Sequence, residues 1–251
     1  MKIFILTKLK TKIIIVLFWV FVWEIANRII ANHILMVGPF DTVSRLFELA
    51  GELIFWQAIA VSFSRIFLGF VLALVVGIFL AAFSFIFPIF RLFMLPALNA
   101  LKAVPVASFV VLAILWVGSS GLAVFVAFVT VVPIVYFNTY AGIKSTDPQL
   151  IEMAGLFKIG PYKKIRHIYI HCVAPYVISA ASTGFGFAWK SGIAAELIGV
   201  AQNTIGFNLH MARIFLQTAD LFAWTLTIVL LSFFIEKIFL YFFERAGYDN
   251  N

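Results

Sequence analysis

Long apolar stretches without charge dominate the pattern of this sequence. Residues 66–90 and 103–143 contain no Asp, Glu, Lys or Arg. A membrane-spanning helix needs about 20 consecutive, mostly apolar residues, so the first stretch can cross a bilayer once and the second is long enough for two crossings. The sequence VGSSG at 117–121 divides the second stretch, because Gly and Ser in this arrangement favour a turn between helices.

Shorter apolar stretches complete the pattern and predict an all-α polytopic membrane protein. No segment alternates with the period of two that a β-barrel strand requires. The basic N-terminus resembles a secretory signal, but no small-residue cleavage site follows it, and we expect an uncleaved first helix. We predict about six transmembrane helices, at roughly 13–31, 62–87, 95–117, 121–143, 172–191 and 219–243.

Composition supports this class, since 64% of the 251 residues are hydrophobic and only 12% are charged. So many hydrophobic residues are more than the core of one soluble domain of this length can bury. Most of the 18 lysines and arginines fall on one side of the predicted helices. Because basic residues collect in cytoplasmic loops, both termini and the basic segment 151–176 are expected in the cytoplasm. The net charge of +7 then reflects topology, and we expect no nucleic-acid partner.

The basic segment predicts two short amphipathic helices. Asp147 can cap the first helix and Pro148 fits its first turn. The sequence IGP at 159–161 ends it, and a second helix follows. On physical grounds the segment either rests on anionic lipid or docks another protein, because the small residues Ala154 and Gly155 would admit a close neighbour.

This segment resembles the EAA loop of ABC importer permeases. Glu152, Met153 and Ala154 occupy the opening triplet, and Ile168 falls at the expected isoleucine. Further blocks resemble, in order and spacing, the nitrate, sulfonate, taurine and bicarbonate importer branch, over about residues 41–246. They are SFSRIFLGFVLALVVGIFLA, LNALKAVPVASFVVLAILWVG, VVPIVYFNTYAGIKSTDPQLIEMA, AWKSGIAAELIG and IGFNLHMAR.

The resemblance implies a type I ABC importer permease fold: a single permease domain over 1–251, with an extra N-terminal helix at about 1–40, a core at 41–246 and a cytoplasmic coupling loop at 144–171. It implies that the loop fits a groove on a separate ATPase, which binds the ATP and Mg²⁺, so that this chain is not itself an enzyme and holds no cofactor. The coupling residues that it indicates are Asp147, Glu152, Met153, Ala154, Gly155, Leu156, Lys158 and Gly160.

The resemblance also implies partners and a location. Two permease copies would line one pathway in the bacterial inner membrane, and a periplasmic or lipid-anchored binding protein would deliver the solute. A small oxyanion such as sulfonate, taurine, nitrate or bicarbonate is the expected substrate. A secondary transporter or channel remains the alternative, although the sequence shows neither an inverted repeat nor a ring of charge within the spans. An intramembrane enzyme would need a catalytic set within the membrane, and we find none.

The sequence departs from the EAA pattern at two positions. The family glycine falls on Lys158 and the family proline on His171. If Lys158 enters the ATPase groove, its ammonium group needs an anionic partner to offset desolvation. We therefore expect an acidic residue on the cognate ATPase.

Polar residues inside the predicted spans are candidates for the pathway, since ionisable groups there are costly and often functional. Pro96 and Pro105 interrupt a predicted span, and such irregular backbone is tolerated only in protein or along a cavity. Lys190 and Glu196 lie on either side of Gly192, where we expect the fifth helix to end or break. The pathway candidates, for which packing alone is the alternative role, are Asn99, Lys102, Pro105, Ser108, Lys190 and Glu196.

Two other patterns are rejected as sites. GFGFAWKS at 184–191 has the outline of a phosphate-binding loop, but Trp189 replaces the glycine that lets the backbone fold around phosphate. His167 and His171 have the spacing of two metal ligands on a helix, but no cysteine or nearby carboxylate completes a site. Metal binding is therefore not expected. The single cysteine, Cys172, excludes an internal disulfide.

Overall fold

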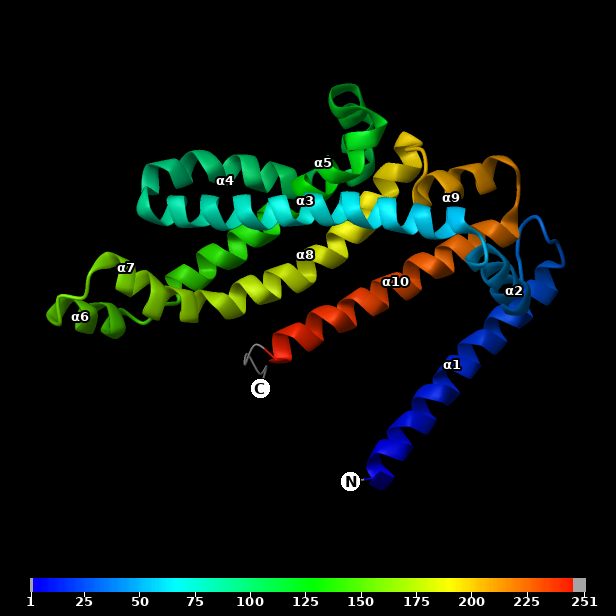
Figure 1. The fold of residues 1–251 in the computed structure, drawn as a ribbon, viewed down its shortest axis with the longest axis horizontal. Coiled ribbons are helices and arrows are strands. Elements are labelled where there is room, and N and C mark those ends of the chain that lie inside the picture. Colours follow the sequence, from blue (N-terminus) through cyan, green and yellow to red (C-terminus); the bar gives the residue numbers. More distant parts are fainter. Residues whose placement is uncertain (1, 246–251) are drawn as a thin grey trace. The chain divides into compact units, whose positions relative to one another are not determined.

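The computed structural model describes residues 2–245, and within this range every element is a helix (Figure 1). The all-α class is thus confirmed. Residues 1 and 246–251, which include the two chain ends expected in the cytoplasm, lie outside the described residues. The elements are α1 (Lys2–Ile30), α2 (Pro39–Ala50), α3 (Leu53–Ile86), α4 (Pro88–Ala103), α5 (Val106–Lys144), α6 (Pro148–Leu156), α7 (Pro161–Lys164), the π-helical turn η1 (Ile165–Tyr169), α8 (Ile170–Gly199), α9 (Ile205–Ile214) and α10 (Thr218–Arg245).

Five segments within the described residues are long and apolar enough to cross a membrane: Ile13–Ile30, Leu53–Ile86, Val106–Lys144, Pro161–Gly199 and Thr218–Ile238. The sequence predicts a span over 95–117 that Pro96 and Pro105 interrupt, and the structure confirms the interruption at Pro105 but not at Pro96, which lies inside α4. α4 ends at Ala103, Val104 is extended and α5 begins after Pro105. Proline disfavours helical backbone at the residue before it, so Pro105 divides the predicted helix into two pieces.

The predicted break at 117–121 lies at Gly118, within α5. Gly118 has φ 65° and ψ 175°, a conformation that is essentially restricted to glycine. α5 is therefore bent at this point (Figure 1). The helix on either side of Gly118 continues without an intervening loop.

The chain divides into two compact units. The first comprises Met1–Gln57 and Asn208–Val229, and the second comprises Ala58–Phe207 and Leu230–Asn251. In the first unit, Trp23 Nε1 donates a hydrogen bond of 3.0 Å to the Val37 carbonyl. Arg45 Nε donates one of 2.5 Å to Asp220 Oδ1 and thereby joins α2 to the start of α10.

The core of the second unit is formed where α5 and α8 pack along each other and α3 packs against both. Gly69, Ala73 and Gly77 lie on one buried side of α3. A Cβ atom on Gly77 would come within 2.7 Å of Val135 Cβ, so α3 and α5 approach more closely than a larger side chain would allow. This spacing of small residues is typical of helix packing in membranes.

Candidate functional site

The helix α6 begins where the basic segment predicts it. Asp147 Oδ1 accepts a hydrogen bond of 2.8 Å from the Gln149 N–H, and Pro148 occupies the first turn. The side chain thus satisfies one of the backbone donors that a helix start leaves free. This cap confirms the predicted start of the first helix in the loop.

The chain leaves α6, which ends at Leu156, through left-handed backbone at Lys158, the residue at the position of the family glycine. The Lys158 N–H donates to the Gly155 carbonyl at 3.0 Å, and the Ile159 N–H donates to the Ala154 carbonyl at 2.9 Å. These two bonds form a Schellman motif, which requires left-handed backbone at the residue after the cap. Lys158 has φ 51°. A glycine would adopt this conformation without the cost that a side chain incurs, about 1 kcal/mol.

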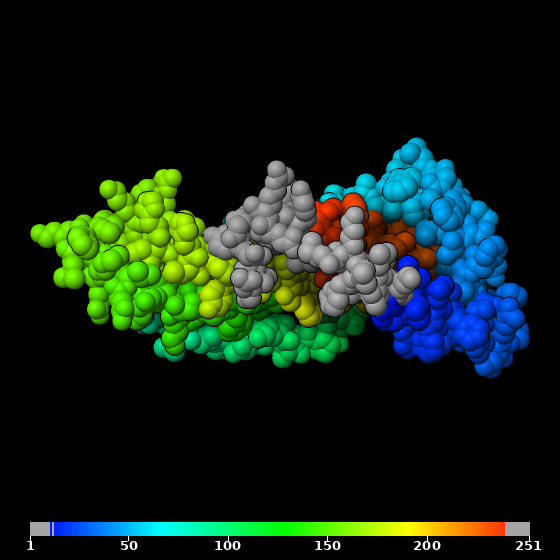
Figure 2. Space-filling model, turned by 90° about the horizontal axis from the view of Figure 1, so that it is seen from below, coloured from blue at the N-terminus to red at the C-terminus, as the bar shows by residue number. Residues whose placement is uncertain are grey.

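The loop presents an apolar edge to its surroundings. Leu156 is 84% exposed and Phe157 is 75% exposed. A Cβ atom on Gly155 would meet no atom within 4 Å, so this position is open to a partner. Ala154 is different, because it is fully buried against its own chain. Figure 2 shows the loop projecting at one end of its unit.

The loop leads without interruption into a membrane-spanning helix. α7 passes through the π-helical turn η1 into α8, and together they form the candidate span Pro161–Gly199. His167 and His171 are exposed on this helix. Among the described residues, no group of three or more His, Cys, Asp or Glu side chains is placed to hold a metal ion.

The candidates near the α4–α5 break lie on the surface of their unit. Asn99, Lys102, Pro105 and Ser108 are all exposed. The ammonium nitrogen of Lys102 lies 4.5 Å from the centre of the Phe137 ring on α5, within range of a cation–π interaction. Among the described residues, no hydrogen bond joins Asn99, Lys102 and Ser108 to one another.

Glu196 lies in a buried polar cluster near the end of α8. Its Oε2 accepts hydrogen bonds of 2.7 Å from Ser62 Oγ and 3.4 Å from the Gly206 N–H. Ser62 Oγ in turn accepts one of 2.9 Å from the Ile205 N–H. The first turn of α9 thus donates to a carboxylate and a hydroxyl, an arrangement that the dipole of a helix N-terminus favours.

The Glu196 cluster contains residues that sequence reasoning missed. Ser62 is 134 positions away in the chain, and no local pattern indicates the pairing. Gly206 packs so closely against Glu196 that a Cβ atom there would overlap its side chain, and no local sequence pattern indicated this contact. Glu196 Oε1 and Arg65 Nη1 are both buried without a hydrogen-bond partner among the described residues.

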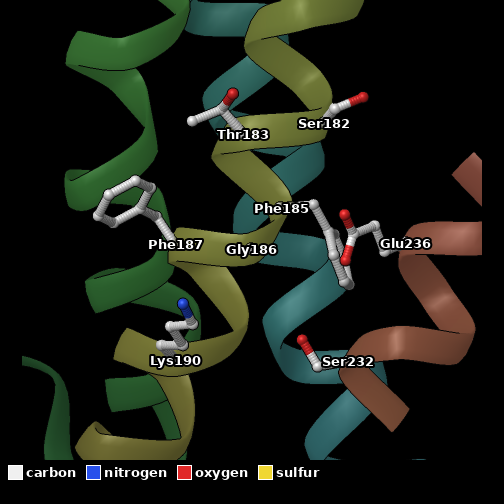
Figure 3. A pocket seen from close by; sticks show the side chains of 8 residues that line it. All are labelled: Ser182, Thr183, Phe185, Gly186, Phe187, Lys190, Ser232 and Glu236. Carbon is white, nitrogen blue, oxygen red and sulfur yellow. The ribbon is translucent and has the colours of Figure 1, made fainter. Parts of the chain in front are cut away.

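Lys190 faces a different environment from Glu196. The expected end or break at Gly192 is wrong, because α8 continues to Gly199 and Gly192 is packed against Ile66. Six residues apart on one continuous helix, Lys190 and Glu196 point in different directions. Lys190 is exposed and borders a cavity of about 290 Å³ (Figure 3). The other polar residues that line this cavity are Ser182, Thr183, Ser232 and Glu236.

Five candidate spans, an exposed interhelical loop and polar residues within the spans define a helical membrane protein. A solved structure described as an amino acid ABC transporter with histidines matches this fold with a TM-score of 0.62. The match covers 84% of this chain and 100% of the chain in that structure, and the two sequences are 19% identical. This likeness concerns the fold.

Residues 73–246 match the family of binding-protein-dependent transport system inner membrane components, and the chain belongs to this family. It is the permease of an ABC importer. A probable ABC transporter permease of Brucella melitensis is 26% identical over 208 residues, which are 82% of this chain and 83% of the relative. The taurine transport system permease of Escherichia coli is 22% identical over 220 residues, 85% and 80% of the two chains. A bicarbonate transport permease of Synechocystis is 28% identical over 155 residues, 61% and 55% of the two chains.

Proposed function

We propose that this permease imports a small oxyanion, that two copies line one pathway, and that a separate ATPase drives it through the loop at 144–171. The observation that carries the proposal is the form of that loop. Its helix α6 is capped by Asp147, held at its end by a Schellman motif and exposed along Leu156 and Phe157. An ordered apolar edge on a basic cytoplasmic loop suits a protein partner better than water.

The contact with the ATPase is assigned to the exposed part of this loop. Met153, Leu156 and Phe157 would provide the apolar contact, and Gly155 would admit the partner's side chains. Ala154 would not contact the ATPase directly; it is buried against its own chain and supports the position of α6. The full set proposed for coupling is Asp147, Glu152, Met153, Ala154, Gly155, Leu156, Lys158 and Gly160.

The pathway is assigned to polar residues on the spans and at the α4–α5 break. A lysine exposed to lipid at the centre of a span is costly, about 2.5–3.5 kcal/mol, and Lys190 is exposed on α8. Its side chain therefore faces water or a second permease copy. The residues proposed for the pathway and its gate are Asn99, Lys102, Pro105, Ser108, Lys190 and Glu196.

The proposal extends to the substrate, the location and the domain organisation of this chain. Relatives carry the names of taurine, aliphatic sulfonate and bicarbonate transport permeases, which supports a small oxyanion. Both termini lie in the cytoplasm of the bacterial cell, and residues 1–40 add a helix to a permease core at 41–246. An external binding protein delivers the substrate, and the ATPase holds ATP and Mg²⁺.

Reconstitution tests this function. The permease is purified with its ATPase in proteoliposomes, and uptake of the solute that co-purifies with the binding protein is measured. We expect uptake that requires ATP, the ATPase and the binding protein together. Flux driven by a solute gradient through the permease alone would refute the proposal.

A further inference from the structure

Charges of both signs face the cavity beside α8. Lys190 on α8 and Glu236 on α10 line it, and both side chains are exposed. Each lies within a candidate span. Among the described residues, neither makes a hydrogen bond or an ion pair. Two unpaired charges within membrane segments are costly, and one bound solute that carries both opposite charges would offset that cost.

The remaining lining of the cavity suits a small polar solute. Ser182, Thr183 and Ser232 contribute hydroxyl groups, which can donate to an anion or accept from an ammonium group. At Gly186 a Cβ atom would meet nothing within 4 Å, so the space above the α8 backbone is open. The volume of about 290 Å³ lies at the lower end of the range for small-molecule sites.

The two charges that line the cavity come from different helices, Lys190 from α8 and Glu236 from α10. Figure 3 shows the Lys190 side chain on one side of the α8 ribbon and the Glu236 carboxylate, which comes from α10, on the other side. A simple anion would use the Lys190 side and leave Glu236 unpaired, and Glu236 would repel it. The arrangement therefore favours a solute with a positive group as well.

We propose that this cavity binds a small zwitterion in the permease itself, with the anionic group at Lys190 and the ammonium group at Glu236. The inference rests on the proposed function, because the solute must pass through this subunit. It also narrows that function: among small oxyanions it selects those that carry an amino group. The Ser182, Thr183 and Ser232 hydroxyls complete the contacts to the two ends.

Binding to the purified permease–ATPase complex in lipid nanodiscs, without the binding protein, tests the proposal. The probes are two matched pairs, 2-aminoethanesulfonate with ethanesulfonate and glycine with acetate. We expect one zwitterion to bind at least about tenfold more tightly than its matched anion, since a charged hydrogen bond of this kind is worth a factor of ten or more. If neither zwitterion is preferred, the proposal is wrong.

Variants assign the preference to the cavity. Glu236→Gln should remove the preference for the zwitterion, and Lys190→Met should weaken binding of both members of a pair by about tenfold or more. Gly186→Leu should abolish binding by filling the open space, with an unchanged melting temperature. Lys237→Gln is the matched control, because Lys237 is an exposed neighbour of Glu236 that does not line the cavity. A preference that survives Glu236→Gln would overturn the assignment.

Two further measurements separate this proposal from its alternatives. ATP-driven uptake by the wild-type system tests the import function independently of the cavity. Normal uptake without a zwitterion preference would therefore refute the cavity assignment and leave the import function supported. The oligomeric state of the purified permease in the Lys190→Met and Glu236→Gln variants tests whether the two residues pair across permease copies. Loss of assembly in both single variants would show such pairing and overturn the zwitterion site, whereas unchanged assembly with the loss of the zwitterion preference in Glu236→Gln supports it.

Discussion

Ser62 on α3 donates a hydrogen bond of 2.7 Å to the carboxylate of Glu196 on α8, in a region where both residues are fully buried. The same hydroxyl accepts from the backbone N–H of Ile205 at the start of α9. One serine therefore connects three helices. Because an unpaired buried carboxylate is costly, this serine stabilises the packing at the end of the α8 span.

Ser62→Ala should destabilise the protein, because the Glu196 carboxylate and the Ile205 N–H would each lose a partner. Hydrogen bonds to charged groups contribute about 1.5–3 kcal/mol, and we expect a clear fall in the melting temperature of the purified permease. Ser64→Ala is the control, since Ser64 is exposed and, among the described residues, its hydroxyl donates to the Val61 carbonyl of its own helix and to no other group. Equal melting temperatures for the two variants would contradict the role of Ser62.

Gly206→Ala should also destabilise the Glu196 cluster, for a steric reason. A Cβ atom at Gly206 would overlap both the Glu196 side chain and the backbone of Leu197. To relieve this overlap, α9 must move away from α8, which weakens the packing between the two helices. The melting temperature should therefore fall. Gly186→Ala is the matched control, because its Cβ atom would enter open space; it should melt like the wild type.

Lys158→Glu should weaken assembly with the ATPase, because it places a negative charge where we expect an acidic partner residue. The measurement is co-purification of the ATPase with the permease, together with ATP-driven uptake. Lys163→Glu makes the same charge change on α7, outside the set proposed for coupling, and should have the smaller effect. Unchanged assembly and uptake in Lys158→Glu would exclude an electrostatic role for this lysine.

Lys158→Gly should stabilise the end of α6, because glycine adopts the left-handed backbone at this position without a steric cost. We expect slower hydrogen exchange at the amides of residues 158 and 159, by about fivefold for roughly 1 kcal/mol. Lys163→Gly should act in the opposite direction, because it puts glycine into the helix α7. Faster exchange in Lys158→Gly would show that the lysine side chain stabilises the loop.

Arg45 should be more important for stability than Arg28. Hydrogen bonds with Asp220, and then with Glu48, raise the pKa of Arg45, so the guanidinium group keeps its charge. A double-mutant cycle of Arg45→Met with Asp220→Asn should give a coupling of about 1–3 kcal/mol. The Arg28–Glu24 pair, whose arginine side chain is 78% exposed, should give a coupling below about 1 kcal/mol. Similar couplings for the two pairs would argue against a stabilising role for Arg45.

Local sequence signals predicted local features of the fold well. Asp147 and Pro148 indicated the start of α6, and Gly118 indicated the bend in α5, because each acts on backbone within a few residues. Pro105 indicated the break between α4 and α5, because proline restricts the backbone of the residue before it. Pro96 was expected to interrupt the span as well and lies inside α4 instead. Gly192 was misread as a break, because a glycine in a span can equally serve close packing, here against Ile66.

The polar sites depended on distant parts of the chain and could not be predicted in full. Glu196 and Lys190 stood out as charges within a span, but Ser62 and Glu236 became visible only through tertiary packing. Ala154 was expected to face a partner and is buried instead, because periodicity shows which residues share a face and not which neighbour covers it. The role of the proposed coupling and pathway residues stays a prediction.

The continuity of the helix from Pro161 to Gly199 has a mechanical consequence. At about 1.5 Å per residue, the start of this helix lies roughly 50 Å from Glu196. Within this segment no non-helical linker separates the loop from Glu196, so a displacement of the loop passes through helical backbone, which includes the π-helical turn η1 and Pro175, to the polar cluster that joins α3, α8 and α9. This helical segment can act as a lever between the loop and the cluster.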